Sequence, residues 1–205
     1  MWVEFLVTSF VVALVPGTGV VYTISSALGG GWRRGALAAV GCTFGIVPHV
    51  AAAMLGVSGV MQAGAVAFEV VRWVGVAYLL FMGIAMWRER GALQLDAQSD
   101  TEPRATGAVI RRGILLNLLN PKLTVFFFAF LPQFLDGDRG LLDLHLLALG
   151  AAFMLTTLVV FVAYAALSAV VREKVLGAPR LLRRIQRSLG TLVIGFAARL
   201  ALTDS

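Results

Sequence analysis

Asn117-Leu118-Leu119-Asn120-Pro121-Lys122 lies inside an apolar run that extends from Gly113 to Leu135. Pro121 has no amide proton and its ring clashes with the carbonyl of Asn117, so a continuous helix is kinked or broken here. Asn is a favoured N-cap and Pro a favoured first helical residue, and Asn120-Pro121 therefore predicts the start of a second half-helix. Lys122 stands beside the free amides and the positive dipole end of that helix. The stretch predicts a site for an anion, most simply a carboxylate.

The position of Lys122 inside an apolar run carries a free-energy cost. A lysine in the middle of a membrane helix costs about 3 kcal/mol, so such charges face a bundle interior or a watery cavity. Asn117 and Asn120 are its polar neighbours. The alternative is a structural lysine that pairs with a neighbouring helix at a proline kink. No carboxylate lies in the middle of a predicted span, which favours a ligand for Lys122 over an ion pair.

The composition indicates an integral membrane protein built of helices. Hydrophobic residues make up 59% of the chain and charged residues 14%, whereas about a quarter of the residues in soluble domains are charged. The apolar runs are near-continuous and of helical length, which is typical of membrane helices and not of a barrel. The net charge of +6 lies in short loops, so it indicates membrane topology and no nucleic-acid partner. A single cysteine, Cys42, excludes an internal disulfide.

The sequence predicts an all-α protein with six membrane spans. The spans are roughly 5–28, 35–62, 68–87, 113–135, 144–171 and 188–202. The amino terminus lacks the basic start of a signal peptide, and we expect it to be a retained first span. We expect a short loop at 29–34, a long polar loop at 88–106, an acidic turn at 136–143 and a basic surface segment at 172–187.

The positive charges predict the orientation of the spans. The loops after spans one, three and five hold 2, 5 and 6 Lys or Arg residues, whereas the opposite loops hold only Arg72 and Arg139, with Arg199 near the end of the last span. Because basic loops remain on the cytoplasmic side, both termini are expected outside a bacterial inner membrane.

An odd number of spans in each half places the two halves in opposite orientations. We expect one membrane domain, 1–205, with half one at 1–87, a cytoplasmic linker at 88–112 and half two at 113–205. Spans one and four then correspond, and both are interrupted at proline, at Pro16-Gly17 and at Asn120-Pro121. Interrupted helices at corresponding positions of inverted halves indicate a transport site, which here includes Pro16, Gly17, Thr18 and Gly19.

Other residues are weaker candidates. Gly41 and Gly45 have the spacing of a helix-packing face, and such faces also allow a homodimer. His49 is a candidate for proton coupling, because an imidazole titrates near neutral pH, or alternatively a hydrogen-bond partner between helices. Glu69 is a second coupling candidate, although a pair with Arg72 is the stronger expectation. Thr156 and Thr157 either line a cavity or form hydrogen bonds between helices.

The sequence lacks the motifs that other functions of a membrane protein would require. Two histidines and one cysteine are too few for an intramembrane metalloprotease or for a typical metal exporter. No nucleotide-binding or serine-nucleophile motif occurs, so we expect neither an enzyme nor a cofactor. The prediction is a secondary exporter of a small molecule in the lipid bilayer. The alternative is export of a metal cation or another small solute on the same fold.

The chain resembles the lysine-exporter type translocator family, which includes homoserine and threonine efflux proteins. The resemblance covers nearly the full length and rests on Pro16-Gly17, Gly41, Gly45, His49, Arg72-Trp73-x-Gly75-x-x-Tyr78-Leu79-x-x-x-Gly83, Asn120-Pro121-Lys122 and Arg187-x-x-Gly190. It implies an inner-membrane exporter of amino acids or their derivatives with six spans, driven by the proton gradient.

One position departs from the family pattern. Many members have Pro-Gly-Pro followed by Asp or Asn, whereas this chain has Pro16-Gly17-Thr18-Gly19. If the missing side chain holds a substrate amine or a coupling cation in the family, Thr18 and freed backbone carbonyls replace part of it here. A neutral amino acid is then favoured over a cationic one.

Overall fold

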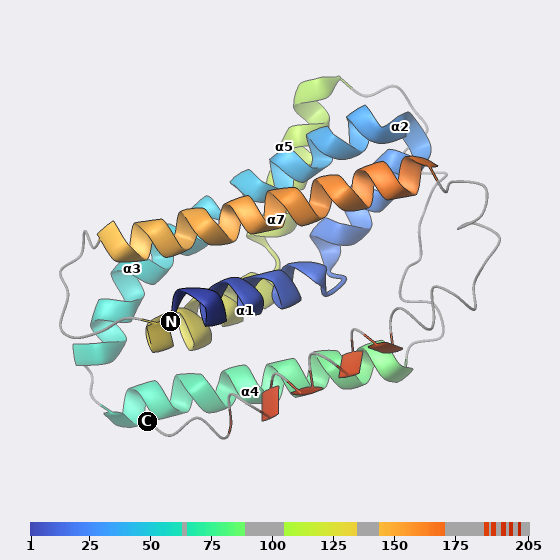
Figure 1. Cartoon of the computed structure of the whole chain (residues 1–205). Coiled ribbons are helices and arrows are strands. Elements are labelled where there is room, and N and C mark those ends of the chain that lie inside the picture. Colours follow the sequence, from blue (N-terminus) through green and yellow to red (C-terminus); the bar gives the residue numbers. More distant parts are fainter. Residues whose placement is uncertain are drawn as a thin grey trace.

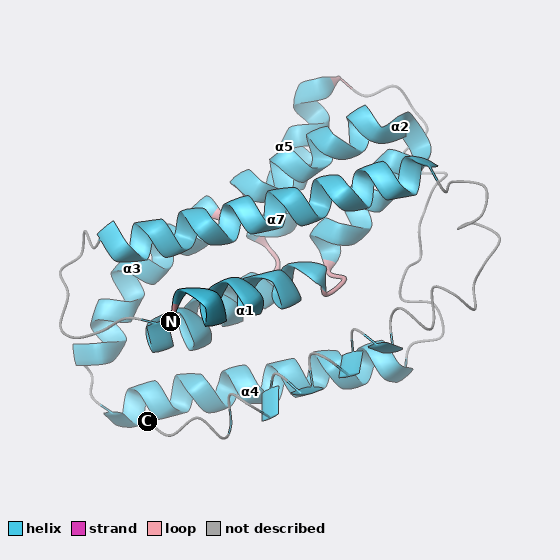
Figure 2. Ribbon diagram, viewed as in Figure 1, coloured by secondary structure: helices cyan, strands magenta, loops and turns pink. Residues whose placement is uncertain are grey.

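The computed structural model describes residues 1–62, 65–88, 105–134 and 144–170, together with separate residues between 187 and 201, and these are almost entirely helical (Figure 1, Figure 2). The elements are α1 (Trp2–Leu14), α2 (Thr18–Phe44), α3 (Val47–Gln62), α4 (Ala65–Arg88), α5 (Thr106–Leu118), α6 (Pro121–Val125), the π-helix η1 (Phe126–Phe130), the 3-10 helix η2 (Leu131–Phe134) and α7 (Leu144–Val170). The predicted all-α class is confirmed for this part of the chain.

Several predicted spans have counterparts among these helices. By length and composition alone, Thr18–Leu55 and Leu144–Val170 qualify as membrane spans among the described helices, and Thr18–Leu55 includes the kink at Gly31. The pair Thr106–Leu118 and Pro121–Phe130 also qualifies when it is taken together, and it is bent by 51° at its break. α4 covers the third predicted span. The turn at 136–143, nearly all of the basic segment at 172–187 and seven of the fifteen residues of the predicted sixth span lie outside the described residues.

The predicted loop at 29–34 is instead a reversal at one residue. α2 is helical on both sides of Gly31, which alone departs from helical geometry, with φ 79° and ψ 175°. Residues eight apart in a continuous helix are separated by about 12 Å along its axis. A Cβ added at Gly35 nevertheless falls 2.6 Å from the Cβ of Ala27, so the chain doubles back. Glycine adopts a positive φ without steric cost, which makes the tight turn possible.

The helix before the second break starts earlier than predicted. α5 begins at Thr106, so the last seven residues of the predicted linker 88–112 are helical. This segment packs closely on α2 because glycines face backbone at their crossing. A Cβ at Gly41 or at Gly45 would collide with the carbonyl oxygens of Ile110 and Ile114 of α5. Glycines at these positions therefore let the two helices approach closely.

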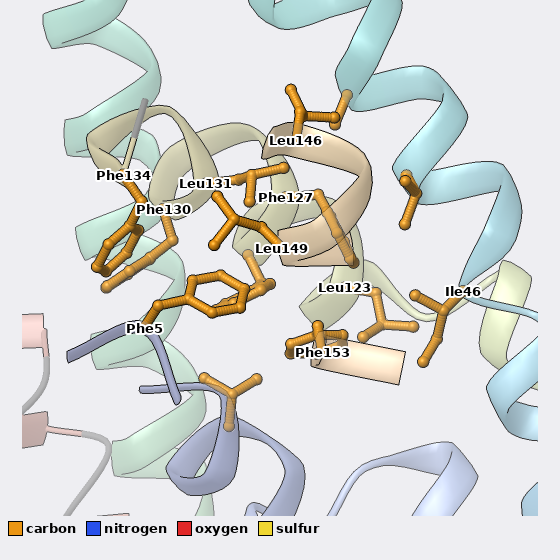
Figure 3. Packing of buried hydrophobic residues seen from close by; sticks show 14 of the residues in the cluster. Phe5, Ile46, Leu123, Phe127, Phe130, Leu131, Phe134, Leu146, Leu149 and Phe153 are labelled. Atoms are coloured by element: carbon orange, nitrogen blue, oxygen red, sulfur yellow. The ribbon is translucent and has the colours of Figure 1, made fainter. Parts of the chain in front are cut away.

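An aromatic cluster fixes the opposite end of the broken pair (Figure 3). Phe126, Phe127 and Phe130 of η1 are buried, and Phe126 contacts both α1 and α7. The ring of Phe126 lies 4.4 Å from that of Phe153 on α7 and 6.3 Å from that of Phe5 on α1, centroid to centroid. α6 is thereby held against both helices, and its first residues are positioned beside the end of α1.

Candidate functional site

The two proline breaks lie against each other. α1 ends at Leu14, Val15 is extended, and Gly17 is the N-cap of α2. α5 ends at Leu118, and α6 begins at Pro121. A Cβ added at Gly17 would lie 3.5 Å from Asn120 Nδ2 and 3.5 Å from Lys122 Nζ. Figure 2 shows both breaks as short loops between helices. The structure thus brings together residues that were predicted from two distant parts of the sequence.

Lys122 binds the end of α1. Its Nζ donates hydrogen bonds to the carbonyl oxygens of Val12 (3.1 Å) and Val15 (2.9 Å), and the residue is only 4% exposed. Pro16 has no amide proton with which to occupy the Val12 carbonyl, so that oxygen lacks its helical partner. Hydrogen bonds to a charged donor contribute about 1.5–3 kcal/mol each, and the helix dipole favours a cation at this end. Within the described residues, Lys122 has no carboxylate partner.

Asn120 caps α6 as predicted from the sequence. Its side-chain oxygen accepts from the amide of Lys122 at 3.1 Å, and Pro121 occupies the first helical position. Asn120 Nδ2 donates to Asn117 Oδ1 at 3.2 Å, and Asn117 Nδ2 donates to the carbonyl of Cys42 at 2.7 Å. The amides therefore form a chain of hydrogen bonds from the start of α6 to α2. This chain fixes the orientation of the break.

His49 lies on the other side of the same break. Its Nε2 is 3.2 Å from the Asn117 carbonyl, which Pro121 deprives of its usual helical donor and which also accepts from the amide of Asn120 at 3.1 Å. Its Nδ1 lies 3.4 Å from Thr124 Oγ1. A carbonyl only accepts, so Nε2 is the donor in this contact, and Nδ1 is the ring atom beside the Thr124 hydroxyl. Of the two predicted coupling candidates, His49 is the one placed at the breaks.

Asn117 fills the space beside Gly19. A Cβ added at Gly19 would lie 2.7 Å from Asn117 Oδ1 and 3.0 Å from Cε2 of Phe161. Asn117 is 1% exposed. A carboxamide from span four therefore occupies the place where a side chain at position 19 would begin. A side chain at position 19 would therefore have to displace this carboxamide.

Three further contacts complete the site. Thr18 Oγ1 donates to the carbonyl of Leu116 at 3.2 Å, and Tyr164 OH donates to the carbonyl of Leu14 at 2.9 Å. Thr124 binds His49 as described above. Sequence reasoning missed Tyr164 and Thr124, because a single hydroxyl inside an apolar helix carries no periodic or spacing signal. Their roles depend on which helix packs opposite them.

Of the remaining candidate residues, two form hydrogen bonds within their own helices, apart from the contacts at the breaks described above. Glu69 accepts a hydrogen bond from Trp73 Nε1 at 3.2 Å on its own helix, and Trp73 is half exposed. The side chain of Arg72 lies outside the description, so the predicted pair with Glu69 stays a prediction. Thr156 donates to the carbonyl of Ala152 in its own helix. The described residues contain no group of three or more His, Cys, Asp or Glu that could hold a metal ion.

A buried lysine where two interrupted apolar helices meet is typical of secondary transporters, which use broken helices to bind substrate. The chain belongs to the LysE type translocator family, whose sequence model matches residues 10–204. It is therefore a multi-pass membrane protein of a transporter family, as predicted, and the expectation that it is not an enzyme is confirmed by this membership.

Full-length relatives carry different names. An uncharacterized membrane protein of Vibrio cholerae is 32% identical over 201 residues, covering 98% of this chain and 96% of its own. The homoserine/homoserine lactone efflux protein of Salmonella typhi is 31% identical, covering 98% of this chain and 95% of its own. The leucine efflux protein of Klebsiella pneumoniae is 29% identical, covering 100% and 96%. No solved structure matches the chain.

Contact between position 19 and Asn117 is testable by a double-mutant cycle. Gly19→Ala should destabilise the protein, because its new methyl meets Asn117 Oδ1, and Asn117→Ala should destabilise it by removing the amide network. Combined, the two changes should cost about 1–2 kcal/mol less than their sum, since the second makes room for the first. Thermal unfolding in detergent measures all four proteins. Additive effects would contradict the described contact.

Proposed function

We propose that the chain exports neutral amino acids or close derivatives from the cytoplasm by proton-coupled antiport. The observation that carries the proposal is the position of Lys122. Its ammonium group is buried between the end of α1 and the start of α2, where it satisfies carbonyls that a proline break left open. The names of the relatives support an amino-acid substrate, since they include homoserine/homoserine lactone and leucine efflux proteins.

The substrate carboxylate would bind between Lys122 and the first turn of α2. The amides of a first turn have no acceptor within their own helix, and Gly17 offers no side-chain cap. Lys122 Nζ is adjacent to Gly17, and so is Asn120 Nδ2. A charged donor and free amides at the positive end of a helix together favour a carboxylate.

The substrate ammonium would take the place that Lys122 occupies on α1. The carbonyls of Val12 and Val15 accept from one ammonium group now, and a second ammonium group of the same charge and geometry fits the same acceptors. Lys122 would then turn toward the carboxylate. The exchange keeps the carbonyls bonded before and after binding, so substrate entry leaves no acceptor unsatisfied.

The charge of the site favours a neutral amino acid. One zwitterion supplies a carboxylate for Lys122 and an ammonium group for the carbonyls. A cationic side chain would need a further acidic partner, and the sequence of the two breaks, at 12–19 and 117–124, contains no Asp or Glu. Gly19 brings no side chain of its own, and Asn117 beside it is a neutral amide.

His49 is proposed as the proton-coupling group. Gain of a proton at Nδ1 would reverse the hydrogen bond with Thr124, because Nδ1 would then donate and the hydroxyl would accept. His49 also holds the carbonyl of Asn117, which is part of the network behind Lys122. Proton binding at His49 would therefore affect the substrate site through Asn117.

Alternating access would come from rocking of two inverted halves, with half one at 1–87, the linker at 88–112 and half two at 113–205. Both termini would lie outside a bacterial inner membrane, and a homodimer is compatible with faces of small residues. The contact between the two breaks supports this arrangement, because each half contributes one broken helix to the site. Export of a metal cation or another small solute on the same fold is the alternative.

Lys122→Ala should abolish export, because the carboxylate loses its charged ligand. Arg33→Ala is a matched control, since it removes one positive charge from the exposed turn near Gly31 and should export normally. Cells expressing each protein are fed dipeptides, and amino acids outside are quantified together with the amount of protein in the membrane. Normal export by a Lys122→Ala protein present at the wild-type level would remove the lysine from the site.

His49→Gln should leave export insensitive to a proton gradient, because glutamine cannot bind the coupling proton. Glu69→Gln should respond to the gradient as the wild type does. Initial rates are measured in vesicles with and without an imposed pH difference. If His49→Gln kept the full acceleration and Glu69→Gln lost it, the coupling role would pass to Glu69.

A further inference from the structure

Two buried hydroxyls near the breaks have no hydrogen-bond partner. Ser9 on α1 is 0% exposed and Thr157 on α7 is 2% exposed, and neither Oγ of Ser9 nor Oγ1 of Thr157 has a partner within the described structure. Hydroxyls in helices usually bond to the carbonyl four residues earlier. Thr43 and Thr156 do so, to Ala39 and Ala152. Ser9 and Thr157 are left with unused donors and acceptors, which is unfavourable in a buried place.

Ser9 lies level with the first turns of the broken span. On α1 it is one turn from Phe5, whose ring packs on Phe126, and one turn from Val12, whose carbonyl binds Lys122. Lys122 and Phe126 are themselves one helical turn apart. Ser9 therefore stands between these two contacts, roughly 4.5 Å along α1 from the residue that holds the lysine.

Thr157 is placed at the same level from the opposite helix. It is one turn from Phe153, which stacks on Phe126, and one turn from Phe161, whose ring lies 3.0 Å from the Cβ position of Gly19. α1 and α7 run in the same direction, since Trp2 contacts His145 at one end and Leu14 accepts from Tyr164 at the other. Figure 1 shows the two helices extending together. Both residues thus lie at the level of the segment between Lys122 and Phe126.

We propose that Ser9 and Thr157 form a subsite for a hydroxyl group on the substrate side chain. This inference rests on the proposed export of amino acids. The subsite lies about one turn from the groups assigned to the carboxylate and the ammonium, which is the distance that a short side chain covers. Each serine or threonine hydroxyl both donates and accepts, so the pair matches the donor and acceptor of a substrate hydroxyl. An aliphatic side chain of the same size would leave both groups without partners, and the site discriminates against it.

The test compares homoserine with norvaline, which has a methyl group in place of the hydroxyl. Full-length protein is reconstituted into vesicles loaded with either amino acid, and the ratio of the two initial export rates is measured. The variants are Ser9→Ala and Thr157→Val, each of which removes one hydroxyl. Thr156→Val is the matched control, because its hydroxyl is already bonded to Ala152. Thr157→Ser keeps the hydroxyl and loses only a methyl group.

The wild type should export homoserine faster than norvaline. Ser9→Ala and Thr157→Val should each lower that ratio about tenfold, whereas Thr156→Val and Thr157→Ser should preserve it. An unchanged ratio in variants that still export amino acids would overturn the subsite and leave the proposed function standing. Equal falls in both rates would also overturn it, since they indicate a structural role. A wild type that exports no amino acid would overturn the proposed function, and the subsite with it.

Discussion

Two prolines each remove one helical hydrogen bond, and a side chain from another element contacts each of the two carbonyls concerned. Pro16 leaves the carbonyl of Val12 open, and Lys122 takes it. Pro121 removes the usual helical donor of the Asn117 carbonyl, which accepts from the amide of Asn120 at 3.1 Å and also has His49 Nε2 at 3.2 Å. An unpaired carbonyl in an apolar environment costs free energy, so the Val12 carbonyl at the first break requires a partner such as Lys122. The breaks, the lysine and the histidine are therefore parts of one arrangement.

This arrangement makes the end of α1 depend on the second half of the chain. Lys122 and Tyr164 both donate to carbonyls in the last turn of α1 and the residue after it. A hydrogen bond from a side chain on another helix can be replaced by one from a ligand, whereas a backbone hydrogen bond inside a helix cannot. In the proposed mechanism, a ligand that brings its own ammonium and carboxylate would substitute for Lys122 on α1 and bind Lys122 itself. The contact that stabilises the end of α1 would thus provide the route for substrate binding.

The sequence predicted the local parts of this site better than the tertiary ones. Proline and asparagine chemistry is local, so the break at Asn120-Pro121 and its cap could be read directly. That the Lys122 ammonium binds α1 could not, because the partners of a buried charge depend on which backbone lies opposite it. Gly31 shows a similar limit, since a turn of one positive-φ glycine has no signature beyond a glycine-rich stretch. The contact between Asn117 and Gly19 could not be predicted either, because it depends on how two helices pack.

The exchange at Lys122 can be observed directly, because the chain contains only two lysines, Lys122 and Lys174. Purified protein carrying lysine labelled with carbon-13 at Cε would give two signals, assigned with Lys174→Arg. Addition of an exported amino acid should shift the Lys122 signal in a saturable way and leave that of Lys174 unchanged. If calorimetry showed that the amino acid binds while the Lys122 signal stayed in place, the lysine would be structural and the exchange mechanism would be wrong.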